Sequence, residues 1–83
     1  MVKRQKLLKK LFNNPKDVAF NDMIKLVESF GFVLSRVSGS HHIFTHSRLA
    51  EIINLQKVGD KAKSYQVKQF LALIERYDLQ MES

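Results

Sequence analysis

Apolar residues recur at helical spacing in three segments of the chain. The first, about residues 3–13, ends at Asn13-Asn14-Pro15, because a residue before proline is pushed out of the helical region. The second, about residues 20–30, ends before Gly31, which can adopt the left-handed conformation of a helix C-terminus. The third begins near Ser64, a residue type favoured as an N-cap. The three apolar stripes are Leu7, Leu8, Leu11 and Phe12; Phe20, Met23, Ile24, Val27 and Phe30; and Val67, Phe70, Leu71, Ile74 and Tyr77.

Between the second and third helices the pattern changes to that of β-strands. Phe32–Val37 is rich in β-forming residues, and His41–His46 follows it after a Ser38-Gly39 turn, so the two segments predict a hairpin. A shorter third strand is expected at Glu51–Leu55, and Val58–Lys61 is expected to be a loop. The order α-α-β-β-β-α with short connections predicts an α+β domain of two layers. In it, helices cover one face of a three-stranded antiparallel sheet.

Length and composition limit the class of protein. At 83 residues the chain has room for one small domain, and 45% hydrophobic with 27% charged residues is a globular composition. The absence of cysteine excludes a disulfide framework, thiolate chemistry and a cysteine-based zinc site. No apolar run approaches the roughly 18 residues of a membrane span. The basic N-terminal segment, interrupted by Lys9 and Lys10, lacks the form of a signal peptide, so we expect a cytoplasmic protein without a membrane partner.

The formal net charge of +6 is unevenly distributed. Residues 1–16 contain six basic and no acidic residues; from totals of 14 and 8, the rest of the chain holds eight of each. A second basic segment, 57–68, contains four lysines against the single acid Asp60: Lys57, Lys61, Lys63 and Lys68. Such clusters either attract phosphate groups or form the solvated face of a helix, and the charges alone leave both interpretations open.

All three histidines fall in the second predicted strand. Alternation along a strand places His42 and His46 on the same face as Phe44, the largest apolar group, so we expect that face to contact the helices. His42 is then expected to be structural and His46 to be solvated at the strand end. His41 and Ile43 lie on the opposite face, although Ile43 leaves the assignment open because either side would bury one apolar residue.

The histidines do not predict a metal site. His42 and His46 would lie about 13 Å apart at roughly 3.3 Å per residue of strand, too far for ligands of one zinc ion. A single histidine can nevertheless cleave RNA, because the ribose 2′-OH is the nucleophile and imidazole can accept its proton. Arg36, across the hairpin from His41, could stabilise the charge on the phosphate. The alternative is a surface histidine with no chemical role.

Two segments of the chain carry a resemblance to a known family. One has Gly31-Phe32, then Arg36, then Gly39-Ser40-His41 followed shortly by an aromatic residue. The other is Lys63-Ser64-Tyr65-Gln66-Val67, which opens the last helix. Together they closely resemble the HicA family, and the resemblance covers about residues 18–79. Many members instead have a Pro-His pair in the third strand and Gly-Thr-Leu at the start of the last helix, differences that bear on substrate preference and partner geometry.

The resemblance implies a toxin of a bacterial toxin–antitoxin pair. It implies an endoribonuclease that cleaves mRNA without a metal or other cofactor, and a double-stranded-RNA-binding-domain-like α-β-β-β-α core. It also implies that His41 is the catalytic general acid/base, and that a HicB-type antitoxin protein covers the active surface. We expect one domain over 1–83, with residues 1–15 as an extra basic helix. The phosphate contacts are assigned to Arg36, Lys57, Lys61, Lys63 and Lys68.

Two other functions fit the same residues. A non-catalytic RNA-binding module would use the lysines and arginines without an imidazole on the open face. A protein-interaction domain would use the histidines only structurally. His41 is the residue that separates the three hypotheses.

Overall fold

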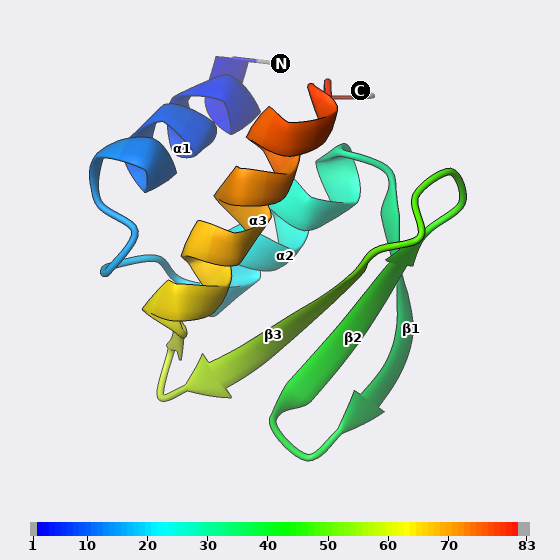
Figure 1. Ribbon diagram of the computed structural model, residues 1–83. Helices are drawn as coiled ribbons and strands as arrows, with labels where there is room; N and C mark the ends of the chain where they lie inside the picture. The colour runs from blue at the N-terminus through cyan, green and yellow to red at the C-terminus, as the bar shows by residue number, and fades with distance from the viewer. Residues whose placement is uncertain (1, 82–83) are drawn as a thin grey trace.

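The computed structural model describes residues 2–81, apart from the side chains of residues 2–5 and 7. Within them the chain forms three helices and four strands (Figure 1). Their bounds are α1 Val2–Asn13, α2 Phe20–Ser29, β1 Phe32–Ser38, β2 His41–His46, β3 Ile52–Val58, β4 Lys61–Ala62 and α3 Ser64–Tyr77. The predicted α+β class and the helix–sheet–helix core are thereby confirmed, as is the additional N-terminal helix.

The sheet is antiparallel throughout, with strand order β1-β2-β3-β4. β1 and β2 form the predicted hairpin, and Gly39 at its turn has a φ of 61°, which glycine adopts without strain. The register of this hairpin shifts between Leu34 and Arg36, so β1 carries a β-bulge at Ser35. Because of the bulge, Arg36 pairs with Ile43 and its side chain shares the face of Ile43.

The third strand is longer than expected, and the predicted loop Val58–Lys61 is shorter, a turn at Gly59-Asp60 between two paired strands. β3 continues to Val58, turns at Gly59, and pairs with the two-residue strand β4 through Val58↔Lys61 and Lys57↔Ala62. β4 also forms a bridge with Ala19, just before α2. The short fourth strand therefore attaches the connection between α1 and α2 to the edge of the sheet.

The helices lie on one side of the sheet (Figure 1), with α2 and α3 against it and α1 packed on α2. Phe32, Phe44 and Phe70 are among the largest fully buried side chains, and Phe70 of α3 contacts the ring of Phe32 at 6.3 Å between centroids. Burying each such side chain contributes roughly 1.5–3 kcal/mol. We call the sheet face turned away from the helices the open face.

α1 is part of this core, although its stripe is narrower than predicted. Leu11 is fully buried, and Leu8 is half-buried against the core. Phe12 is 45% exposed, so it lies at the margin of the contact, and the side chain of Leu7 lies outside the described residues. Among the described side chains of α1, Leu11 therefore makes the most deeply buried contact.

Candidate functional site

His41 lies at the start of β2, on the open face. Its register partners are Ser38 on β1 and Gln56 on β3. Phe44, an odd number of residues along the same strand, is fully buried on the helix side, so alternation directs His41 away from the helices. The imidazole therefore projects from the open face of β2, which is paired on both sides, with β1 and β3.

A hydrogen bond to Asn54 of β3 orients the imidazole. Nδ1 of His41 lies 3.1 Å from Oδ1 of Asn54, and both side chains are half-buried. An amide oxygen can only accept, so Nδ1 must carry the proton. In the neutral imidazole the lone pair is then on Nε2.

The second ring nitrogen of His41 is accessible. Among the described residues, His42 Nδ1 is the one buried side-chain nitrogen or oxygen that lacks a hydrogen-bond partner. Nε2 of His41 has no partner in the described part of the chain either, so it must be in contact with solvent. This nitrogen can exchange a proton with a molecule bound on the open face.

Arg36 is exposed on the same face but is not directly opposite His41. Its partner in the register is Ile43, whereas Ser38 occupies the position opposite His41. Arg36 is therefore a diagonal neighbour, at a separation that a long side chain can span. The guanidinium can reach an anion beside the imidazole without contacting the ring itself.

The start of α3 is attached to the strand position beside His41. The predicted N-cap Ser64 is instead the first helical residue; Lys63 occupies the cap position, and no side chain caps it. The backbone N–H of Lys63 donates to the carbonyl of Gln56 at 3.2 Å, and the N–H of Gln56 donates to Oε1 of Gln66. Because Gln56 pairs with His41, these bonds fix the beginning of α3 next to the histidine.

The four lysines of residues 57–68 fall into different environments. Lys57 is exposed, and its backbone N–H donates to Ser40, the residue before His41, at 3.1 Å. Its side chain, however, follows Ile53 and Leu55 on the helix side of β3, near Phe20 and Asp60, so the structure does not place it with His41 on the open face. Lys63 is exposed, with Nζ 5.9 Å from the ring centre of Tyr65. Lys68 is exposed on α3 and makes no ion pair with any described residue.

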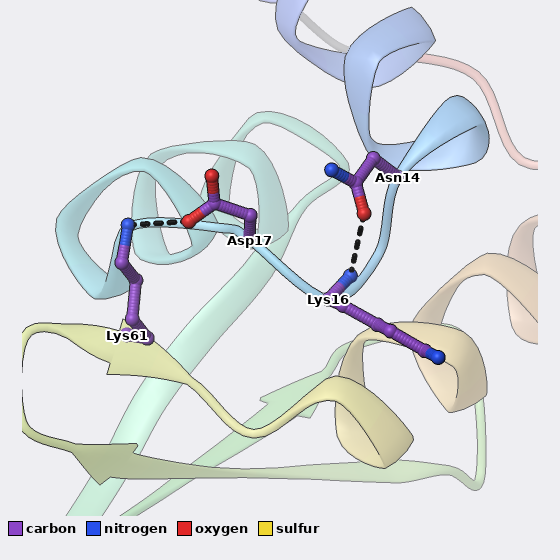
Figure 2. A network of polar contacts seen from close by, with 4 residues as sticks. All are labelled: Asn14, Lys16, Asp17 and Lys61. Atoms are coloured by element: carbon purple, nitrogen blue, oxygen red, sulfur yellow. Dashed lines mark hydrogen bonds and ion pairs between the residues drawn. The ribbon is translucent and has the colours of Figure 1, made fainter.

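Lys61 is paired with Asp17. Its Nζ lies 2.6 Å from Oδ1 of Asp17 (Figure 2), and both side chains remain more than half exposed. The hydrogen bond and the opposite charge lower the pKa of Asp17 and raise the pKa of Lys61. The same connection is held by a bond from the Lys16 N–H to Oδ1 of Asn14 at 3.4 Å (Figure 2). Lys61 therefore shares its charge with a carboxylate, unlike Lys63.

The other two histidines lie on the helix side. The ring of His42 meets the ring of Phe20 edge-on, with centroids 4.9 Å apart, as a structural residue would. The expectation that His46 is merely solvated is wrong: it is half-buried, contacts Phe32, and hydrogen-bonds through both ring nitrogens. Its partners are the Phe30 carbonyl and the Arg48 N–H, and strand alternation cannot reveal backbone partners from other segments.

The described residues contain neither a metal-binding cluster nor a membrane-spanning helix. No group of three or more His, Asp or Glu side chains there could hold a metal ion. None of the helices in residues 2–81 combines the length and the apolar character that crossing a membrane requires.

Sequence reasoning did not identify Asn54 and Gln66. Asn54 meets His41 because β2 and β3 pair in one particular register, and Gln66 meets β3 because α3 begins beside it. One sequence signal points to Asn54. It is a polar residue two positions before Gln56, so strand alternation places both on the same face.

Comparison with models of known protein families assigns the chain to one family. A family model described as the HicA toxin of bacterial toxin–antitoxin systems matches residues 20–75. The match runs from the start of α2 almost to the end of α3, which is well over half of the chain, and α1 precedes it. Comparisons with curated proteins and with solved structures gave no significant match. The chain belongs to the HicA toxin family of bacterial toxin–antitoxin systems.

Proposed function

We propose that this protein is the toxin of a HicAB-type pair and acts in the cytoplasm as a metal-independent endoribonuclease on mRNA. The observation that carries the proposal is the state of His41: Nδ1 is bonded, Nε2 is accessible, and the ring lies on an uncovered sheet face. Membership of the HicA family supports the same reaction class. We propose that the reaction requires no cofactor.

In the proposed reaction, Nε2 of His41 accepts the proton of a ribose 2′-OH as the oxygen attacks the adjacent phosphorus. The bond from phosphorus to the 5′ oxygen breaks, and that oxygen receives a proton from the imidazolium. The products are a 2′,3′-cyclic phosphate and a 5′-hydroxyl. Arg36, on the same face, would offset the charge that develops on the phosphate oxygens, and Lys63 at the start of α3 would bind a flanking phosphate.

The proposed partner is a HicB-type antitoxin that covers the open face. Val33 and Ile52 lie on this face, aligned through Thr45 of β2, and each is 65% exposed. They lie about 13 Å along β2 from His41, at roughly 3.3 Å per residue, so one protein that covered these apolar side chains would also extend over the histidine. An antitoxin seated there would block access to His41.

Inducible expression in bacteria tests the proposal, with the unchanged protein beside His41→Ala. We expect the unchanged protein to stop growth and fragment mRNA, and the variant to do neither at equal abundance. Co-expression of the antitoxin from the neighbouring reading frame should restore growth. Equal toxicity of both proteins would contradict the role of His41.

A non-catalytic RNA-binding module is the alternative that the exposed Lys57, Lys63 and Lys68 favour. The purified protein separates the two functions. A binding module would retain RNA at low salt without producing a 2′,3′-cyclic phosphate end.

A further inference from the structure

We propose that Asn54 is a positioning residue for His41: it holds the imidazole in the tautomer that leaves the Nε2 lone pair facing the substrate. The inference rests on the proposed nuclease function, since it assigns Asn54 a role through His41 and not through direct contact with RNA. Its basis is the 3.1 Å contact between Nδ1 of His41 and Oδ1 of Asn54.

The sheet register fixes this contact. Asn54 pairs with Ile43 and Gln56 pairs with His41, so Asn54 is the diagonal neighbour of His41 on the same face. β3 lies between β2 and β4 and is covered on its other face by α3. The amide therefore projects from a supported strand, where it can hold a ring in one orientation better than a loop residue could.

The hydrogen bond determines which nitrogen is available for proton transfer. Which ring nitrogen of a histidine carries the proton is set by the partner of the other. A hydrogen-bond acceptor on Nδ1 keeps the proton there, and the accessible Nε2 becomes the base. Without the amide oxygen, the ring can rotate and populate the tautomer with a protonated Nε2, which cannot accept the 2′-OH proton.

An amide suits this position better than a carboxylate when the substrate is RNA. A carboxylate would orient the ring equally well, but it would add negative charge on the face that must bind phosphates. Asn54 accepts the hydrogen bond without that charge. The chemistry of the side chain therefore matches a polyanionic substrate.

Two substitutions and one control test the role of Asn54 in the full chain. Asn54→Leu removes the acceptor at similar size, and Asn54→Asp keeps an acceptor but adds charge. Thr45→Val is the control, because it removes a polar group from an exposed position of the same face. Each variant is compared in melting temperature, in ¹⁵N chemical shifts of the His41 ring, and in cleavage of a short RNA.

We expect Asn54→Leu to lower kcat by about tenfold to a hundredfold, the range found when the partner that orients a metal-bound histidine is removed, with little change in KM. The two ring nitrogens of His41 should move toward an average of both tautomers. Asn54→Asp should keep the Nδ1-protonated ring and recover most of kcat, with a raised KM. Thr45→Val should match the unchanged protein in kcat and ring shifts.

Two outcomes would overturn the inference, and they are distinguishable. If folded Asn54→Leu cleaves at the normal rate while His41→Ala is inactive, the positioning role fails and the nuclease proposal stands. If both variants cleave normally, both proposals fail. If Asn54→Leu does not fold, Asn54→Asp tests the role instead. The role would be contradicted if the His41 ring of this variant no longer kept its proton on Nδ1, or if its kcat fell as far as that of His41→Ala.

Discussion

His46 joins the end of β2 to the C-terminal end of α2 through the carbonyl oxygen of Phe30. Nε2 of His46 lies 3.1 Å from that oxygen, and Nδ1 accepts the backbone N–H of Arg48 at 3.0 Å. Because Nδ1 is the acceptor, Nε2 carries the proton and donates to Phe30. The last carbonyls of a helix have no partner within it, so a side chain of the sheet satisfies one of them here.

His46→Ala should therefore destabilise the fold. The bond to the Phe30 carbonyl is partly buried and its loss costs about 0.5–1.5 kcal/mol, whereas the exposed Arg48 N–H can bind water instead. In a domain of this size each kcal/mol lowers the melting temperature by roughly 4–8 °C. His46→Gln retains an N–H donor and should recover part of the loss. Thermal unfolding followed by circular dichroism provides the measurement, and an unchanged melting temperature for His46→Ala would contradict the prediction.

His41→Ala should have the opposite profile. A positioned general acid–base group is worth typically 10²–10⁴-fold in rate, so cleavage should fall by about that factor. The side chain is only half-buried and its loss leaves no core cavity, so the melting temperature should change little. Cleavage of a labelled RNA and thermal unfolding are measured on the same preparation, with and without chelator. We expect chelator to leave the rate of the unchanged protein intact; strong inhibition by it would contradict a metal-independent reaction.

Elements marked by a local sequence pattern were predictable, whereas features that depend on which strand residues pair with one another were not. The helices follow from repeated apolar spacing, and the β1–β2 hairpin follows from two segments rich in β-forming residues joined by the Ser38-Gly39 turn. β4 has only two residues, too few to show an alternation of apolar and polar positions. It is recognised as a strand only because it pairs with Lys57 and Val58. The bulge at Ser35, which places Arg36 on the open face, and the contact of Asn54 with His41 both require a known register. Periodicity assigns the face of a side chain but not its neighbour on the next strand.

α1 offers a matched pair of substitutions. Leu11 is fully buried and Phe12, the next residue, is 45% exposed. Leu11→Ala should cost about 2–5 kcal/mol through lost burial and the cavity it leaves, and deleting residues 1–13 should cost at least as much. Phe12→Ala should cost far less. Urea unfolding compares them, and equal midpoints for the two point variants would show that α1 does not pack on the core in solution.

The ion pair between Asp17 and Lys61 should stabilise the fold only within a pH window. The pKa of Asp17 is lowered from its ordinary 3.8, so its contribution is present above that value and is lost as the pH falls through the lowered pKa. The pKa of Lys61 is raised from 10.5, so at the alkaline end the contribution is lost as the pH rises through the raised pKa. Asp17→Asn should therefore lower the melting temperature slightly at neutral pH and not at pH values where Asp17 is protonated. Since the pair is exposed, high salt should shrink the difference; a difference that persists in strong acid would contradict the assignment.

The same ion pair should rank the lysines in RNA binding. Lys63 is fixed beside Gln56, the partner of His41, and is free of any carboxylate among the described residues, whereas Lys61 is neutralised by Asp17. Lys63→Ala should reduce the affinity for RNA. The slope of log affinity against log salt concentration should become less negative by about 0.7 for each phosphate contact with single-stranded RNA that the variant loses. Lys61→Ala should change both quantities less, and Asp17→Asn should increase affinity because it releases Lys61. Fluorescence anisotropy with a 2′-O-methyl RNA measures binding alone, since this ligand lacks the attacking hydroxyl. Equal losses for Lys61→Ala and Lys63→Ala, or no gain for Asp17→Asn, would show that the ion pair does not withhold Lys61 from the substrate.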